Sequence, residues 1–251
     1  MFRPSLPLQT LRPDKPVDKM KEATSSELAR PAPGLTVFES VQNFFYGGMG
    51  MELMDTIQQR QSIRKFTTDP VSDQVIDALL EAARLAPSGS NLQPWRFIVV
   101  KSEEIKEKLY EVTPYKFLVK APVIFVCCAD VTVLETRGKR IQELVEMGTF
   151  TGLEMDNPDS GKYGNSLQDF ITPNGYLAMN VTIAVEHMAL CAADLGLGTC
   201  WVARFDMKKT KEILDLSEDL LVISFLAMGY PAQSPPQRPR LAVEGIFVKT
   251  V

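Results

Sequence analysis

The chain has 251 residues, 45% of them hydrophobic and 23% charged, a composition that allows a sizeable buried core. Its net charge of −4 gives no field that would recruit nucleic acid or an anionic membrane, so neither is expected as a partner. One histidine, His187, and four cysteines argue against a zinc site built from several such ligands, and no metal is expected. A Ser-His-Asp triad would need His187 as its base. Any chemistry is therefore expected to come from a bound group.

The sequence gives no sign of export or membrane insertion. No stretch approaches the roughly 20 apolar residues of a membrane span. The first 25 residues carry acidic side chains and lack the apolar centre of a secretory signal. The cysteines form no C-x-x-C pair and lie in or beside apolar stretches, as buried free thiols do. We therefore expect a cytoplasmic protein.

The first fifty residues differ from the rest. They hold 6 of the 17 prolines, and residues 1–33 cannot bury enough apolar surface to fold alone. Apolar residues then recur at helical spacing, at Val37, Val41, Phe44 and Phe45. We predict an N-terminal extension over residues 1–50, an arm plus a short amphipathic helix, followed by one domain over residues 51–251.

From residue 51 the elements become regular. Helices are expected over residues 51–59, 73–85 (with Ser72 as N-cap), 103–111, 132–147, 174–195 and 208–214. Strands are expected over residues 96–100, 123–128, 220–228 and, at the end, 245–251. Residues 148–165 are rich in Gly, Asp, Asn and Ser and indicate a loop. Helices and strands do not alternate strictly, which favours an α+β layered domain.

Two arginine motifs are candidates for binding an anion. In an extended segment Arg60, Ser62 and Arg64 share one face, and two guanidinium groups with a hydroxyl suit a phosphate. Arg238 and Arg240 also tend to share a face, because the proline between them favours extended backbone. Both pairs could converge on one dianionic group. Solvated basic surface segments would give the same residues.

Two further segments could contact a bound group. The loop at residues 87–95 carries the amides of Asn91 and Gln93, which could read a flat heterocycle, although an ordinary turn with a capping Asn fits too. Residues 196–201 end the long helix in glycines without forming a dinucleotide fingerprint, and no phosphate-binding G-x-x-x-x-G-K-[ST] motif occurs. His187, within the long helix, is more typical of a core or interface histidine.

The order of these motifs resembles the FMN-dependent nitroreductase family. The matching segments are Arg-x-Ser-x-Arg, Ala-Pro-Ser-x-x-Asn-x-Gln-Pro-Trp, Gly-Leu-Gly-Thr-Cys-Trp, and Gly-Tyr-Pro followed by Arg-x-Arg. The resemblance covers about residues 51–251. It implies an α+β three-layer sandwich, with a mainly antiparallel central sheet flanked by helices. It also implies an intertwined homodimer with FMN at the subunit interface.

The resemblance also assigns roles by motif. The phosphate and ribityl end of FMN would be held at Arg60, Gln61, Ser62, Arg64, Arg238 and Arg240. The flavin would be lined, partly from the partner subunit, by Pro87, Ser88 and Asn91, with Gln93 supporting that loop. The segment past the flavin N5 edge would be Trp201, Val202, Ala203 and Arg204. Ala203 and Arg204 stand where smaller residues are frequent, so the contact at N5 is expected to differ here.

The resemblance implies hydride transfer from NADH or NADPH to flavin N5 and then to a small-molecule acceptor, a nitroaromatic, quinone or related compound. The flavin would perform the redox step, and no catalytic side chain is singled out. Residues 130–170 are expected to select the acceptor as a lid. An ene-reductase, a flavin reductase or a reductive dehalogenase on the same fold remains open. So does a flavin-binding protein without turnover.

Overall fold

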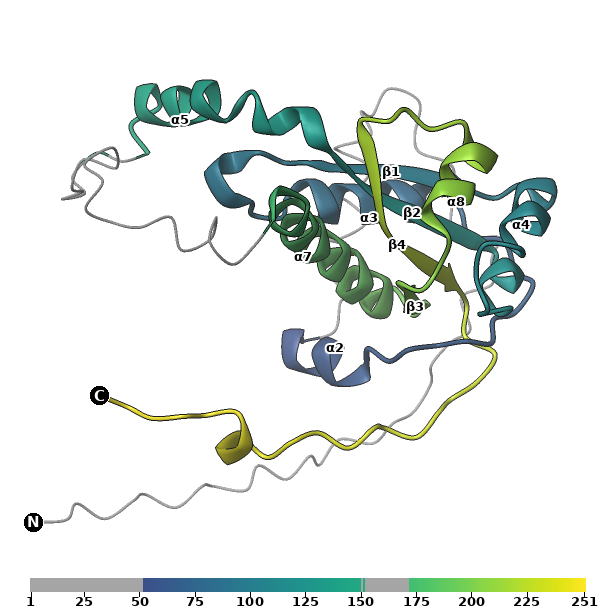
Figure 1. Ribbon diagram of the computed structural model, residues 1–251. Helices are drawn as coiled ribbons and strands as arrows, with labels where there is room; N and C mark the ends of the chain where they lie inside the picture. The colour runs from purple at the N-terminus through teal and green to yellow at the C-terminus, as the bar shows by residue number, and fades with distance from the viewer. Residues whose placement is uncertain (1–51, 150, 152–171) are drawn as a thin grey trace, which may run out of the picture. The chain divides into compact units, whose positions relative to one another are not determined.

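The computed structural model describes residues 52–149, 151 and 172–251 (Figure 1). These residues belong to one compact unit, Val37–Val251. The predicted extension over residues 1–50 lies outside the described residues, as does most of the predicted loop at residues 148–165.

A four-stranded antiparallel sheet forms the centre of the described domain. Its strands are β1 (Trp95–Val100), β2 (Val123–Asp130), β3 (Gly198–Val202) and β4 (Leu220–Gly229), in the order β1-β2-β4-β3. The inner strands β2 and β4 are almost continuously apolar because both of their faces are covered. Their long hydrophobic runs were the clearest strand signals in the sequence.

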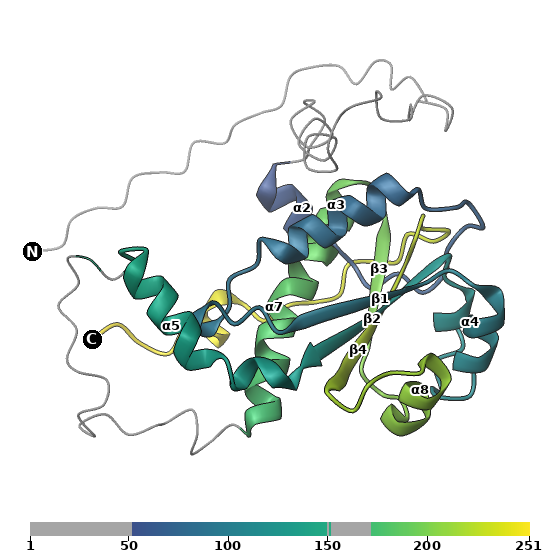
Figure 2. The same ribbon diagram turned by 90° about the horizontal axis from the view of Figure 1, so that it is seen from above.

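Helices cover both faces of this sheet (Figure 2). On one face α3 (Asp73–Arg84) and α7 (Pro173–Asp194) pack on one set of inward side chains, including Phe125 and Leu226. On the other face α4 (Glu103–Leu109) and α8 (Met207–Leu214) pack on the alternate side chains, including Ile124, Val126 and Phe225. Successive strand residues point to opposite faces, so each strand serves both cores. The predicted α+β three-layer sandwich is confirmed.

Several element boundaries follow their local signals. The predicted cap of α3 is confirmed, because the Ser72 hydroxyl accepts a hydrogen bond from the backbone N–H of Val75 at 3.3 Å. Thr172 caps α7 in the same way, and Pro173 occupies its first turn. Gly196, with a φ of +73°, lies just past the C-terminus of α7. The short helix α2 covers Leu53–Gln59.

Three expectations about elements were wrong. Residues 132–147 form two pieces, a 3-10 turn at Val131–Leu134 and α5 (Arg137–Glu146). Residues 245–251 form no strand; a 3-10 turn at Val243–Gly245 precedes an exposed end, with Val248 91% exposed. The edge strand β3 was not predicted at all. Its glycine-containing sequence does not indicate a strand, and the segment is extended because it pairs with β4.

The longest described helix, α7, bears on the expectation that no stretch approaches a membrane span. Among the described residues α7 is long and apolar enough to cross a membrane by length and composition, with a mean hydropathy of 1.3. It packs against α3 and the sheet, and 44% of its most apolar stretch is buried. Its apolar composition is therefore that of the core helix of the domain. His187 lies on this helix, where its Nδ1 is 3.3 Å from the carbonyl oxygen of Ala82, as in a satisfied core histidine.

The four cysteines are free, as expected. Cys127, Cys128 and Cys200 are buried in the sheet, and Cys191 is half-buried on α7. Burial disfavours the charged thiolate, and it raises the pKa of both Cys128 and Cys191 to about 12. These thiols are therefore protonated near neutral pH.

Candidate functional site

The Arg60–Arg64 segment is fixed against the sheet edge by backbone hydrogen bonds. The N–H of Ile63 donates to the carbonyl of Thr199 in β3 at 2.8 Å, and the N–H of Ala232 donates to the carbonyl of Lys65 at 2.9 Å. Gly198 permits the close approach, since a Cβ there would lie 2.6 Å from the Cβ of Ile63. The segment is thus held between β3 and the chain that leaves β4.

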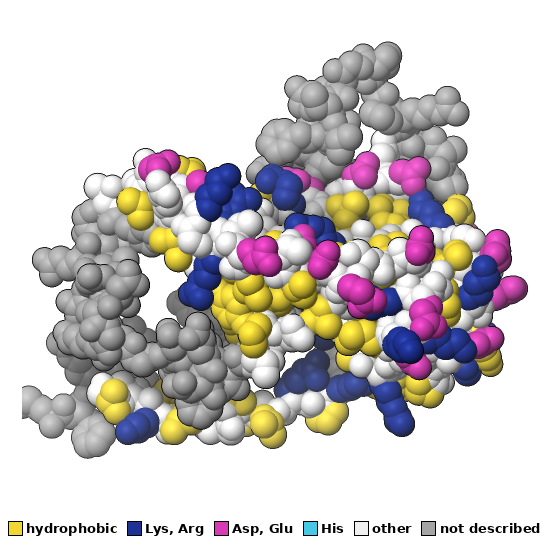
Figure 3. Space-filling view, turned by 45° about the horizontal axis from the view of Figure 1, so that its top comes forward, with side chains coloured by type: hydrophobic (Ala, Val, Ile, Leu, Met, Phe, Trp, Pro, Cys, Tyr) yellow, Lys and Arg dark blue, Asp and Glu magenta, His cyan; other side chains and the backbone are white. Residues whose placement is uncertain are grey.

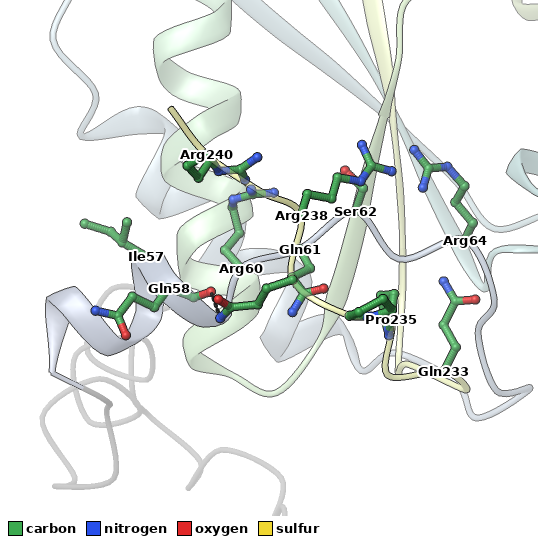
Figure 4. Close-up of a pocket in the computed structure, with 12 residues that line it drawn as sticks. Ile57, Gln58, Arg60, Gln61, Ser62, Arg64, Gln233, Pro235, Arg238 and Arg240 are labelled. Carbon is green, nitrogen blue, oxygen red and sulfur yellow. Dashed lines mark hydrogen bonds between the residues drawn. The ribbon is translucent and has the colours of Figure 1, made fainter. Parts of the chain in front are cut away.

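All six residues expected at the phosphate end line one pocket of about 610 Å³. Figure 4 shows them arriving from two segments, one after α2 and one near the C-terminus. The lining contains four arginines and no acidic residue: Ile57, Gln58, Arg60, Gln61, Ser62, Arg64, Gln233, Pro235, Pro236, Gln237, Arg238 and Arg240. We call this the arginine pocket. Both arginine motifs therefore line the same pocket.

The guanidinium groups of the arginine pocket face one another. Arg64 and Arg238 point toward each other beside Ser62, and Arg60 lies close to Arg240 (Figure 4). Only Arg60 among these four has an ion-pair partner within the described residues, with its Nε 3.7 Å from a carboxylate oxygen of Glu186. Arg64, Arg238 and Arg240 have no such partner among the described residues, so their like charges repel, and an anion between them would remove that repulsion. The arrangement is therefore that of an anion site.

Elsewhere on the described surface, several cations pair with carboxylates. Cations on α4 and α8 are matched by carboxylates, with Lys108 2.6 Å from Glu104 and Lys211 2.7 Å from Glu218. Figure 3 shows acidic and basic side chains interspersed over the face that it presents. The lining of the arginine pocket, by contrast, contains no carboxylate.

Cys200 lies near three arginines of the pocket and stays neutral. Burial raises the pKa of its thiol, although the nearby Arg64 and Arg238 and a hydrogen bond with Ser62 act in the opposite direction. The side chain is 2% exposed. The thiol beside these arginines is thus neutral, and the positive charge of the pocket comes from the arginines.

The loop at Pro87–Gln93 has an unusual backbone. Ser90, Asn91 and Gln93 have φ values of 52°, 51° and 47°, in the left-handed region that side chains other than glycine rarely adopt. Such residues cost about 1–3 kcal/mol each and persist only where surrounding contacts hold them. One such contact is internal, because the hydroxyl of Ser88 accepts a hydrogen bond from the N–H of Gln93 at 2.9 Å. We call this segment the left-handed loop.

The amides in the left-handed loop pair with each other. The side chain of Gln93 donates to the side-chain oxygen of Asn91 at 3.0 Å, which orients the exposed Asn91. This agrees with the supporting role expected for Gln93. None of the candidate residues of the left-handed loop lines the arginine pocket within one chain. The structure therefore does not bring these two expected parts of the site together.

The segment after β3 adjoins the arginine pocket through a turn. Trp201 is half-buried and Val202 is 2% exposed, whereas Ala203 and Arg204 are exposed. The turn that contains Thr113 and Phe117 contacts both parts. The hydroxyl of Thr113 donates to the carbonyl of Arg204 at 2.9 Å, and the ring of Phe117 lies 5.8 Å from the guanidinium carbon of Arg64. One turn thus contacts both the arginine pocket and the end of β3.

Sequence reasoning named Gln61 but missed the other glutamines of the arginine pocket, Gln58, Gln233 and Gln237. Gln237 donates to the backbone carbonyl of Gln58 at 3.2 Å, which ties the C-terminal segment to the end of α2. Gln233 also lines the pocket. Gln233 and Gln237 lie in irregular segments and carry no motif, so only their placement could have identified them.

Fold and pocket together define an α+β domain with an arginine-lined pocket at one edge of its sheet. The family model described as "Nitroreductase family" matches residues 57–153 and 167–230, which is more than half of the chain. The chain belongs to the nitroreductase family. It is accordingly an FMN-dependent NAD(P)H oxidoreductase.

Individual relatives and solved structures agree. An NADPH-dependent oxidoreductase of Staphylococcus haemolyticus is 30% identical over 203 residues, covering 78% of this chain and 72% of that protein. A candidate NADH dehydrogenase/NAD(P)H nitroreductase of Methanothermobacter thermautotrophicus is 29% identical over 193 residues, covering 75% and 82%. A nitroreductase of Exiguobacterium sibiricum in complex with FMN has a TM-score of 0.64 at 21% identity, covering 80% of this chain and 99% of that one.

The arginine pocket fits the cofactor that the family uses. FMN ends in a phosphate dianion, and guanidinium groups bind phosphate oxygens through paired, charge-assisted hydrogen bonds. Four arginines, the hydroxyl of Ser62 and a lining without carboxylates supply that chemistry.

Proposed function

We propose that the protein passes reducing equivalents from NADH or NADPH to a nitroaromatic, a quinone or a related small acceptor. FMN held by the arginine pocket would supply the hydride-transfer chemistry. The observation that carries the proposal is the acid-free arginine pocket within a nitroreductase fold. The protein's own groups bind and orient.

The arginine pocket holds the phosphate end of FMN in this proposal. Arg64 and Arg238 face each other across Ser62, so a phosphate between them accepts hydrogen bonds from both guanidinium groups and from the hydroxyl. Arg60 and Arg240 complete the neutralisation toward the ribityl chain. Gln61 offers an amide beside them.

The left-handed loop, the end of β3 and the two residues after it contact the flavin ring. The residues concerned are Pro87, Ser88, Asn91, Gln93, Trp201, Val202, Ala203 and Arg204. Because the left-handed loop does not line the arginine pocket of its own chain, we propose a homodimer in which a second copy supplies this loop. Arg204 places an exposed guanidinium group near the N5 side of that site. We further propose that the protein works in the cytoplasm.

Anaerobic reduction of the FMN-loaded protein tests the function. NADH and NADPH are added in turn while the flavin absorbance is followed, and a panel of nitroaromatics, quinones, activated alkenes, free flavin and halophenols is then offered. We expect bleaching by at least one donor and reoxidation by a nitroaromatic or quinone. A flavin that neither donor bleaches indicates binding without turnover. Halide release or alkene reduction would instead assign the alternative reactions.

A further inference from the structure

Asn180 is a buried polar residue that the proposed function leaves without a role. It lies within the apolar helix α7 and is 1% exposed. Its side-chain oxygen accepts a hydrogen bond from the N–H of Gly89 at 2.8 Å, and its side-chain nitrogen donates to the carbonyl of Tyr176 at 2.7 Å. A buried amide is tolerated because both of its ends are satisfied. Only one of these partners is local; the other lies 91 residues away, in the left-handed loop.

The same face of α7 presses on the loop at a second point. Tyr176 and Asn180 are one turn apart, so their side chains lie on one side of the helix. A Cβ placed on Gly89 would lie 2.0 Å from the hydroxyl oxygen of Tyr176. Gly89 is therefore fixed both by the hydrogen bond from its N–H and by the absence of space around its Cα.

Gly89 precedes the strained residues directly. Ser90, Asn91 and Gln93 keep left-handed backbone although none is glycine, which requires outside contacts to hold them. Within the loop, Ser88 holds the N–H of Gln93. At the start of the strained run, Asn180 supplies the contact from the helix. Loss of that contact allows the backbone of Ser90 and Asn91 to relax.

We propose that Asn180 is a positioning residue for the flavin ring, acting through the left-handed loop. It holds Gly89 so that the strained backbone presents the exposed Asn91 amide to the ring. This inference rests on the proposed function, in which the loop contacts the flavin. An asparagine suits the task because it accepts from one backbone group and donates to another at the same time.

The inference separates the two ends of the cofactor. Riboflavin carries the ring without the phosphate, so its binding reports on the loop and not on the arginine pocket. Both ligands are titrated against the full-length protein freed of flavin, with flavin fluorescence as the signal. We expect Asn180→Leu to weaken riboflavin and FMN by the same factor of about ten, the size expected for one buried donor left unsatisfied. Thr182→Ala, which removes a hydroxyl bonded only within α7, is the matched control and leaves both affinities unchanged.

A conservative variant gives a readout that a general loss of stability does not imitate. In Asn180→Asp, a protonated carboxyl has one acceptor and one donor, as the amide does, whereas the carboxylate faces the Tyr176 carbonyl with a charge. Burial favours the protonated form. Riboflavin affinity of this variant is therefore expected near the wild-type value at low pH and lower as the carboxyl ionises, with the wild type flat over the same range. The pH profile also decides the question if Asn180→Leu fails to fold.

Three results overturn the positioning role. They are unchanged riboflavin affinity in Asn180→Leu, a loss confined to FMN, and a flat pH profile in Asn180→Asp while the wild type binds riboflavin. A wild-type protein that binds neither flavin overturns the proposed function itself, and the positioning role with it. The two failures are thus distinguishable in one set of titrations.

Discussion

The arginine pocket and the left-handed loop are built in opposite ways. In the arginine pocket, side chains carry the chemistry: four guanidinium groups project from irregular segments, and only Arg60 has an ion-pair partner among the described residues. In the left-handed loop the backbone geometry sets where the Asn91 amide points, and it is held by the Ser88 hydroxyl, by Asn180 and by the lack of space at Gly89. A phosphate is recognised by charge, which tolerates variable geometry. A flat ring is recognised by shape, which requires a fixed backbone. The first region should therefore respond to charge changes and the second to single atoms.

Removing two facing guanidinium groups should give the largest effect. The double variant Arg64→Ala/Arg238→Ala removes two hydrogen-bonding partners of a charged group, each worth about 1.5–3 kcal/mol. FMN affinity is expected to fall by about a hundredfold or more, while riboflavin affinity stays as in the wild type. Flavin fluorescence titration measures both. Arg84→Ala is the control, because Arg84 pairs with Glu81 on α3 away from the pocket. An equal loss for riboflavin would contradict the assignment of the phosphate to this pocket.

A single added methyl group should disturb the left-handed loop. In Gly89→Ala the new Cβ meets the Tyr176 hydroxyl, and such overpacking costs about 1–3 kcal/mol. The free energy of unfolding should fall, and riboflavin should bind more weakly. Adding Tyr176→Phe should restore part of both. Gly138→Ala, in open space on α5, should have the opposite sign and stabilise the helix by about 0.5–1 kcal/mol. Urea unfolding of the three variants tests this; no recovery in the double variant would exclude the contact as the cause.

Gly198 lets a backbone contact determine where side chains lie, since the close approach of Ile63 to Gly198 places the arginines. A Cβ at this position meets Ile63, so Gly198→Ala is expected to shift the Arg60–Arg64 segment and weaken FMN binding by about tenfold. Gly196→Ala is the matched control. It meets no neighbour but has a φ of +73°, so it should cost stability without changing the affinity for FMN. If both variants bind FMN as the wild type does, the contact between β3 and the segment does not position the arginines.

Local patterns in the sequence indicated the arginine motifs and the inner core strands, but not Gln233 or Gln237 of the pocket. The spacing of Arg60, Ser62 and Arg64 predicted a shared face, and the apolar runs of β2 and β4 predicted buried strands. Where pairing decides, the same reasoning failed. Residues 245–251 have a strand-like sequence but no partner within the described chain, whereas Gly198–Val202 becomes a strand because it meets β4.

The left-handed loop shows a second limit of sequence reasoning. Its motif indicated a loop, yet none of its left-handed residues is glycine, so nothing local announces their geometry. The cause lies in the hydrogen bond between Gly89 and Asn180, 91 residues apart. In the sequence Asn180 stands only in a sequon-like triplet within an apolar helix.

The smallest expected effect concerns Cys200, where burial and the arginine pocket compete. Three arginines favour its thiolate, but burial has the larger influence and keeps the pKa of the thiol above its usual value. A group whose pKa is raised by folding stabilises the fold below the unfolded pKa of about 8.5 and loses that contribution at higher pH. Cys200 should therefore react with a thiol reagent at pH 8 only as fast as the protein unfolds, with or without FMN. Faster labelling that FMN blocks would mean that the charge of the arginines outweighs burial. The Cys200 thiol would then not stay neutral beside the charged arginines.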